Sequence, residues 1–138
     1  MTNDERQVLL VEDDASLCDL ITLGLERVGL HLTCTDSSVD AIMKLQRNRY
    51  EVMLLDIMLS GTSGLYVIDA LRDLREHERP QVVVITGAHG NILSTVDRTI
   101  VKAVFFKPLD IGSLAVYVKS LAGRKSEAHP DRGVLRVD

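Results

Sequence analysis

Short apolar runs alternate with stretches of helical periodicity along most of this chain, and this alternation constrains its fold more than any other feature. The runs are rich in Val, Ile and Leu, and most are continuous instead of alternating with polar residues. Continuous runs of this kind are typical of strands that are buried on both faces of a sheet. The runs are Val8–Val11, Leu30–Cys34, Val52–Leu55, Val82–Ile85 and Ala103–Phe106.

Between the runs, apolar residues recur every three or four positions, which predicts amphipathic helices. The predicted helices contain Leu17 to Val28, Ala41 to Leu45, Leu65 to Leu71, Ile92 to Ile100 and Ile111 to Ala122. Such an alternation predicts an α/β domain, a doubly wound five-stranded parallel sheet with helices on both faces. We expect this domain to cover residues 1–123 and to be followed by a polar, mobile tail over residues 124–138.

Charge and cysteine content exclude several classes of function. A net charge of −4 gives no general reason to bind nucleic acid or an anionic membrane. Cys18 and Cys34 match no metal or redox spacing, and each lies in an apolar stretch, so we expect buried free thiols in a reducing compartment. The N-terminus has no apolar segment typical of a signal peptide, and no apolar run is long enough to span a bilayer. A cytoplasmic protein is expected.

Polar side chains follow the apolar runs at their carboxyl ends. In an open α/β sheet, ligands bind at this end of the strands, where the strand order reverses. The second run contributes no obvious polar group, whereas the other four do. The sequence therefore predicts a rim of carboxylates, one hydroxyl and one ammonium group. The rim residues are Glu12, Asp13, Asp14, Asp56, Thr86 and Lys107.

Clustered carboxylates repel one another unless a cation neutralises them. Mg²⁺ suits such a rim, because it takes one or two carboxylates, waters and a phosphate oxygen. Asp56 stands between the acidic pair and the lysine, and aspartate carboxylates form acyl phosphates. We therefore expect Asp56 to be a nucleophile toward phosphorus. Mg²⁺, Thr86 and Lys107 would hold the three phosphoryl oxygens. Asp14 is more simply explained as a helix N-cap than as a metal ligand.

Four segments in this order resemble the receiver domains of response regulators, which act in two-component and phosphorelay signalling. The resemblance covers roughly residues 6 to 122. Each motif is weak alone, but together they occupy the expected strand ends. The segments are Val11-Glu12-Asp13-Asp14, Leu54-Leu55-Asp56-Ile57-Met58-Leu59, Ile85-Thr86-Gly87 and Phe106-Lys107-Pro108.

The resemblance implies a flavodoxin-like sheet with strand order 2-1-3-4-5. It also implies a switch that catalyses its own phosphorylation and slow dephosphorylation, and that is not an enzyme acting on a separate substrate. The phosphoryl donor would be a histidine kinase or a histidine phosphotransfer protein, and the cofactor Mg²⁺, for which Mn²⁺ can substitute. The implied roles are metal binding for Glu12, Asp13, Asp56 and the backbone carbonyl of Met58, phosphoacceptor for Asp56, and phosphoryl-oxygen binding for Thr86 and Lys107.

The same resemblance implies an output face for a downstream protein or a second copy, formed by the fourth helix, the fifth strand and the fifth helix. Val104 stands where many members carry a Tyr or Phe that swings inward, so switching would rely on loop and helix movement after Thr86. Val104, Val116 and Tyr117 are expected to be exposed on this face, either as a small apolar contact patch or as scattered surface residues without a function. His89 is expected to be a solvated loop residue, with tuning of the phosphoryl lifetime as the alternative.

Two other functions compete with the signalling switch. A haloacid-dehalogenase-like phosphatase also uses an Asp nucleophile and Mg²⁺, but it carries a second Asp two residues later, where this chain has Met58. A degenerate receiver that acts only as a constitutive binding module would be expected to lose some of the rim residues, and all of them are present, although Val104 leaves this alternative open. Nucleotide-binding loops of the Walker or G-x-G-x-x-G type are absent from the sequence.

Overall fold

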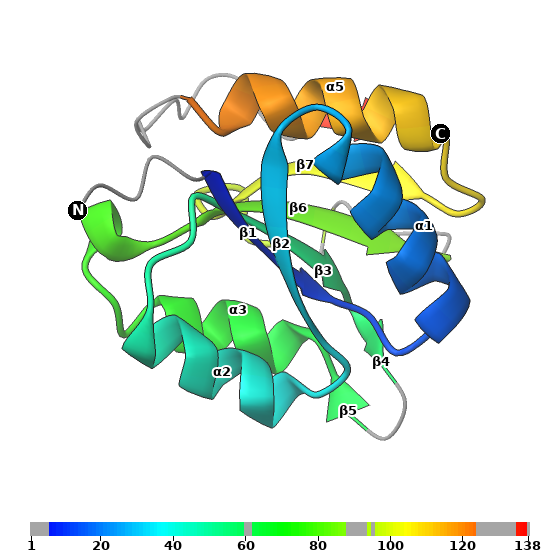
Figure 1. Ribbon diagram of the computed structural model, residues 1–138. Helices are drawn as coiled ribbons and strands as arrows, with labels where there is room; N and C mark the ends of the chain where they lie inside the picture. The colour runs from blue at the N-terminus through cyan, green and yellow to red at the C-terminus, as the bar shows by residue number, and fades with distance from the viewer. Residues whose placement is uncertain (1–5, 60–61, 88–93, 95, 124–134, 138) are drawn as a thin grey trace.

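The computed structural model describes residues 6–59, 62–87, 94, 96–123 and 135–137. Its main sheet contains the five predicted strands, all parallel (Figure 1). Their order is β2-β1-β3-β6-β7, which is the predicted order 2-1-3-4-5. The bounds are β1 Arg6–Val11, β2 Leu30–Thr35, β3 Val52–Asp56, β6 Gln81–Thr86 and β7 Val101–Phe106.

Helices cover both faces of the sheet, as expected for strands that are apolar on both sides (Figure 1). Helices α1, Ala15–Glu26, and α5, Ile111–Leu121, pack together on one face. Helices α2, Ser38–Arg47, and α3, Leu65–Leu71, pack on the other. Alternate residues of each central strand enter one of two cores, so that Leu9 joins the α2/α3 core and Leu10 the α1/α5 core. Both faces of the sheet are therefore packed against helices, as the sequence predicts.

The predicted fourth helix lies largely outside the described residues. At its described end, Val96 and Ile100 are buried, and residues 98–100 form a turn. Asp97 organises this turn by accepting a hydrogen bond from the backbone N–H of Thr99 at 2.9 Å, and Arg72 of α3 binds the same carboxylate at 2.9 Å. His89 also falls among the residues that the structure does not describe.

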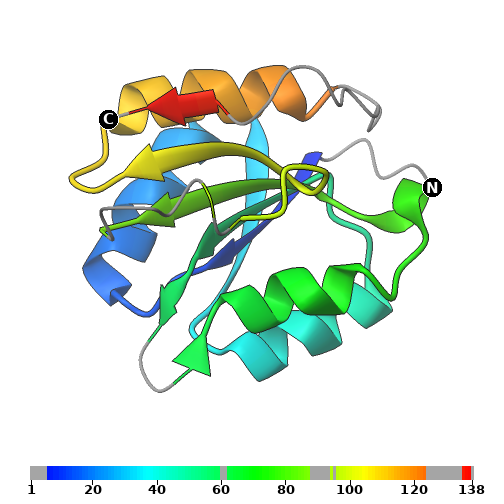
Figure 2. The same ribbon diagram turned by 180° about the vertical axis from the view of Figure 1, so that it is seen from behind.

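The structure adds short elements that the sequence analysis does not predict. Strands β4, Met58–Leu59, and β5, Thr62–Ser63, form an antiparallel pair directly after β3. A 3₁₀ turn, η1, covers Glu76–Glu78. A sixth strand, β8 at Leu135–Val137, pairs in parallel with β7 (Figure 2). β8 is not predicted because three residues are too few to give a strand pattern in the sequence.

The predicted apolar patch of Val104, Val116 and Tyr117 does not form. Val104 is fully buried in the α2/α3 core, whereas the neighbouring Phe105 faces α5 and contacts the ring of Tyr117. Successive residues of a strand point to opposite faces, so Val104 and α5 lie on opposite sides of the sheet. Strand β8 also covers the edge of β7. Only Val116 remains strongly exposed, at 69%.

Side chains cap the N-termini of α1, α2 and α5. Asp14 caps α1 by accepting from the backbone N–H of Leu17, and Asp110 caps α5 through that of Ser113. Ser37 caps α2, because the Ser37 hydroxyl accepts from the N–H of Asp40 at 3.1 Å. Among the described residues, no helix is long and apolar enough to cross a membrane.

Replacing Ser37 by alanine should lower the free energy of unfolding by about 1 kcal/mol, because one N–H at the start of α2 loses its acceptor. Urea denaturation with a two-state fit measures the change. The neighbouring exposed Asp36 provides a control, since Asp36→Ala should change stability by less than about 0.5 kcal/mol. Equal losses in both variants would contradict the assignment of the cap.

Candidate functional site

Four parallel strands bring the predicted rim residues to one edge of the sheet. Glu12 and Asp13 follow β1, Asp56 ends β3, Thr86 ends β6 and Lys107 follows β7. These strands are neighbours in the order β1-β3-β6-β7, so their carboxyl ends lie side by side. The backbone N–H of Lys107 donates to the carbonyl of Thr86 at 2.8 Å, which fixes the lysine beside β6.

The ammonium group of Lys107 joins two of the carboxylates. Its Nζ lies 2.8 Å from Asp56 Oδ2 and 2.9 Å from Glu12 Oε1. Both carboxylate side chains are almost wholly buried, at 3% and 0% exposed, while that of Lys107 is 27% exposed. The lysine therefore reaches in from the rim and supplies a positive charge to a buried acidic pair.

A backbone donor orients the Asp56 carboxylate from its other side. The N–H of Met58 donates to Asp56 Oδ1 at 2.8 Å, at the start of the β4–β5 pair. Gly64 closes this pair against β3, and its N–H donates to the carbonyl of Ile57 at 3.1 Å. A Cβ atom at Gly64 would lie 2.5 Å from the Asp56 carbonyl oxygen, closer than van der Waals contact allows. The tight approach of this backbone helps to position Asp56.

Glu12 carries a buried oxygen whose hydrogen-bonding capacity is not satisfied. Its Oε2 accepts from the backbone N–H of Asp14 at 3.1 Å. Oε1 is buried and, within the described part of the chain, has no hydrogen bond of acceptable geometry despite the nearby Lys107. Burial raises the pKa of Glu12, the ion pair with Lys107 and the hydrogen bond from Asp14 N–H lower it, and the charge of Asp56 raises it. The net pKa is raised, chiefly because the carboxyl group is buried.

The pKa of Lys107 is also raised, which for an ammonium group favours the charged form. Its partial burial lowers the pKa of the ammonium group, but the close contacts with Asp56 and Glu12 and the charges of both carboxylates outweigh burial, and the pKa is raised. The ammonium form is therefore the stable one, and it carries the positive charge of the site.

The donor set fits a divalent cation with oxygen ligands. One carboxylate oxygen each from Glu12, Asp13 and Asp56 lies within 4.8 Å of the others. Asp13 is the most exposed of the three. The unsatisfied Glu12 Oε1 is a ready ligand, and Mg²⁺ prefers such oxygen donors while keeping part of its water shell.

Two predicted roles, those of Thr86 and Met58, have a position in the structure without a test of the role. Thr86 is fully buried at the end of β6, one residue beyond the β6 partner of Asp56. The Met58 side chain is 63% exposed, and its carbonyl as a metal ligand stays a prediction. The expectation that Asp14 is an N-cap is confirmed.

The backbone contacts around Asp56 are the part of the site that sequence reasoning did not foresee. The N–H of Met58 carries no signal in the sequence, because every non-proline residue has one. Gly64 carried a weak signal, as a glycine shortly after the acceptor run, but its contact with Asp56 depends on the β4–β5 pair.

Known proteins are similar to this chain in sequence. The family model of the response regulator receiver domain matches residues 8–119. Sensory transduction protein RegX3 of Mycolicibacterium smegmatis is 28% identical over 134 residues, covering 94% of this chain and 58% of RegX3. Transcriptional regulatory protein ResD of Bacillus subtilis is 29% identical over 126 residues, covering 90% of this chain and 51% of ResD. The chain thus spans about half the length of these relatives.

Solved structures share the fold. A CheY-like receiver domain from Methylobacillus flagellatus has a TM-score of 0.71 and 25% identity, covering 86% of this chain and 99% of that one. TrrA of Thermotoga maritima, solved in complex with Mg²⁺ and BeF, has a TM-score of 0.73 at 22% identity, covering 84% and 98% of the two chains. The family match extends over most of the chain and includes every rim residue described above. This chain therefore belongs to the family of response regulator receiver domains.

Proposed function

We propose that this domain is a cytoplasmic signalling switch that accepts a phosphoryl group on Asp56 from a histidine kinase or a histidine phosphotransfer protein. The observation that carries the proposal is the ion pair of Lys107 with the buried Asp56, inside a cluster that also contains Glu12 and Asp13. A nucleophile, a cation for the phosphoryl group and ligands for a metal ion are the parts that transfer to an aspartate needs.

Glu12, Asp13, Asp56 and the backbone carbonyl of Met58 would hold the metal ion. Mg²⁺ supplies positive charge that offsets the carboxylates and the incoming phosphoryl group, and Mn²⁺ can replace it. The buried Glu12 Oε1 supports this assignment, since a buried oxygen that accepts no hydrogen bond of good geometry is costly.

Each residue of the site has its own role in the phosphoryl transfer. A carboxylate oxygen of Asp56 attacks phosphorus, a phosphorus–oxygen bond forms, and the donor departs with the electron pair of the bond that breaks. Lys107 exchanges its contact with Asp56 for a phosphoryl oxygen, and the Thr86 hydroxyl donates to another. Met58 N–H keeps the carboxylate oriented during the attack. The domain thereby catalyses its own phosphorylation, and we propose that it also dephosphorylates slowly.

Output would pass to a downstream protein or a second copy. The related MtrA of Mycobacterium tuberculosis is a DNA-binding response regulator, matched over 37% of its length, so its DNA-binding function is not carried over to this chain. On the predicted output face, α5 offers the exposed Val116, and β8 lies along β7. A partner at this face would therefore contact α5 and β8 together.

Incubation with acetyl phosphate and Mg²⁺, followed by intact mass measurement, tests the proposal. The wild type should gain the mass of one phosphoryl group, and both a chelator and Asp56→Asn should prevent the gain. Asp69 is an exposed carboxylate on α3, so Asp69→Asn is the matched control and should be labelled like the wild type. Equal labelling of Asp56→Asn and the wild type would refute the assignment.

Asp13→Asn should weaken Mg²⁺ binding and yet stabilise the metal-free protein. The substitution removes one of three clustered negative charges, which repel one another around the single ammonium group that pairs with Glu12 and Asp56. Thermal melts in a chelator should show a higher Tm than for the wild type, and a magnesium titration a larger Kd. A lower Tm in the chelator would contradict the repulsion inferred at the site.

A further inference from the structure

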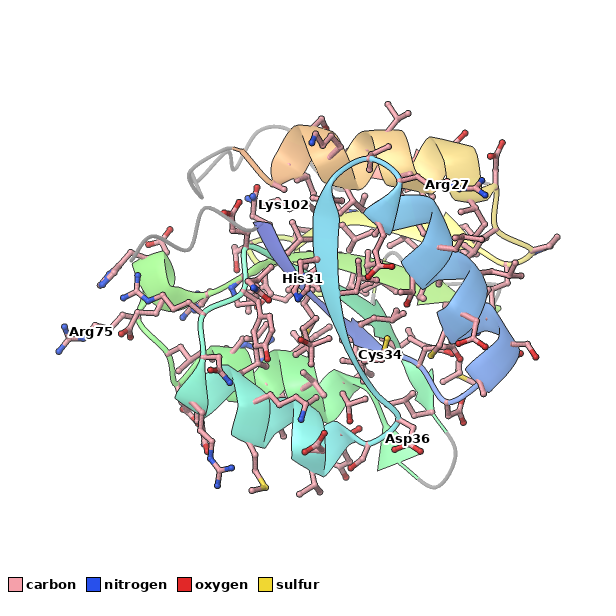
Figure 3. The ribbon with its side chains drawn as sticks, viewed as in Figure 1. Arg27, His31, Cys34, Asp36, Arg75 and Lys102 are labelled. Carbon is pink, nitrogen blue, oxygen red and sulfur yellow. The ribbon has the colours of Figure 1, made fainter. Side chains whose placement is uncertain are left out.

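The two cysteines lie together, although they are separated in the sequence and match no redox spacing. Cys18 is on α1 and Cys34 on β2, and both are free thiols. Leu30 and Leu32 of β2 pack into the α1/α5 core, and Cys34 continues this face because side chains two residues apart on a strand point the same way. Figure 3 shows Cys34 on the stretch of β2 that passes beside α1.

A shared neighbour places the two sulfur atoms on the same surface of α1. The Sγ of Cys34 lies 3.5 Å from the hydroxyl oxygen of Thr22, which is one helical turn after Cys18. Glu12 joins them from the other side, because its carbonyl accepts from the Cys18 thiol and its N–H donates to the carbonyl of Thr35, the residue after Cys34.

The exposure of the two thiols differs in the way that a stepwise oxidation needs. The sequence analysis expected both to be buried, but Cys34 is exposed and Cys18 is only partly so. This correction follows from the position of β2 at the edge of the sheet, where β1 is its one neighbour among the described strands. An oxidant in solution can reach Cys34 first, and Cys18 is protected beside it.

We propose that Cys18 and Cys34 are a modification site, at which a peroxide oxidant links α1 to β2 by a reversible disulfide. The sulfur of Cys34 attacks hydrogen peroxide, so that a sulfur–oxygen bond forms, the oxygen–oxygen bond breaks and water leaves. The sulfur of Cys18 then attacks the sulfenic sulfur of Cys34. The sulfur–sulfur bond forms, and the hydroxyl group leaves with the proton of Cys18 as a second water. Two thiols are thereby oxidised, and one peroxide is reduced to two waters.

The disulfide would also alter a contact of the acidic rim. The thiol of Cys18 donates to the backbone carbonyl of Glu12 at 3.3 Å, directly before Asp13. A disulfide has no S–H, so oxidation removes this donor from the segment that carries two of the proposed metal ligands. The formation of the disulfide itself rests on the thiol geometry and not on the proposed phosphoryl transfer.

Peptide mapping tests the proposal with the full chain. The protein is treated with hydrogen peroxide, free thiols are blocked with N-ethylmaleimide in denaturant, and trypsin is added. Cleavage after Arg27 separates the cysteines, so the link joins peptides 7–27 and 28–44. We expect this joined pair from monomeric wild type, lighter by two hydrogens than the two separate peptides, and its loss after dithiothreitol.

Two conservative variants distinguish thiols that react with each other from thiols that react independently. In Cys18→Ser, Cys34 should be oxidised further to the sulfinic acid or should cross-link two chains, because no resolving thiol is left. In Cys34→Ser, the protected Cys18 should react at least several times more slowly than Cys34 does in Cys18→Ser. The proposal is overturned if Cys34 gives the same product at the same rate in the wild type and in Cys18→Ser, or if the disulfide joins two chains of wild type.

Discussion

Replacing Lys107 by methionine should destabilise the metal-free domain by about 2–3 kcal/mol. The ammonium group is the shared counter-ion of Glu12 and Asp56, whose side chains are 0% and 3% exposed. Removing one partner of a fully buried ion pair costs roughly 3–5 kcal/mol, and the loss should be smaller here because Lys107 is itself partly exposed. Urea denaturation in a chelator measures it, and saturating Mg²⁺ should restore most of the lost stability.

Lys44→Met provides the matched control. Lys44 pairs with Asp40 on the outer surface of α2, and exposed pairs of this spacing contribute only about 0.3–0.5 kcal/mol. The double variant Lys107→Met/Glu12→Gln should regain part of the stability, because it removes one of the two uncompensated charges. If Lys107→Met is no less stable than Lys44→Met in the chelator, the lysine does not neutralise the site.

The effect of pH on the Lys107→Met variant has a definite sign. The pKa of Glu12 is already raised in the folded protein, and loss of the lysine removes a contact that lowers it. A folded state with a raised carboxyl pKa binds more protons than the unfolded state, so its stability falls as the pH rises through the unfolded pKa. The deficit of the variant should therefore narrow as the solution is acidified.

Replacing Gly64 by alanine should cost about 2–3 kcal/mol and also slow the labelling of Asp56. The added methyl group would lie 2.5 Å from the Asp56 carbonyl oxygen and 2.8 Å from the Cα of Ile57. Both contacts are with backbone, which can yield only by shifting the β3–β4 connection, and overpacking of this kind costs about 1–3 kcal/mol. Such a shift would also disturb the bond from Met58 N–H to Asp56.

Gly112→Ala is the control for this prediction. Gly112 lies inside α5, and its added Cβ would meet the Asp110 carboxylate at the ordinary distance of 3.5 Å. Alanine is a better helix former than glycine, so this variant should be neutral or more stable by up to about 1 kcal/mol. Gly64→Ala with unchanged stability and a normal labelling rate would contradict the close approach to Asp56.

The sheet was predictable because its strands are buried on both faces, which leaves continuous apolar runs in the sequence. In β3 and β6 every residue is buried, and the predicted runs differ from these strands by one or two end residues. Strands β4, β5 and β8 were not predicted, since two or three residues carry no periodicity. Val104 is buried, against the prediction, because its side chain enters the α2/α3 core and because β7 lies between β6 and β8.

The polar rim was predictable from chain order and strand direction alone. Glu12, Asp56 and Lys107 lie far apart in the sequence, and only parallel strands in adjacent positions bring their ends together. The contacts that orient Asp56 come from the backbone of Met58 and the approach of Gly64, and these depend on local geometry that residue types do not encode. The proximity of Cys18 and Cys34 required the packing of α1 on β2.

Identification of the residue that carries the phosphoryl group tests the central proposal most directly. After incubation with acetyl phosphate and Mg²⁺, borohydride reduction converts an aspartyl phosphate to homoserine, and tandem mass spectrometry locates the change. Trypsin releases peptide 50–72, which contains Asp56 together with Asp69 and Glu51 as internal controls. The proposal predicts homoserine at position 56 alone, and only when Mg²⁺ is present. Homoserine at another position, or unmodified Asp56 in protein that has gained a phosphoryl group, would contradict it.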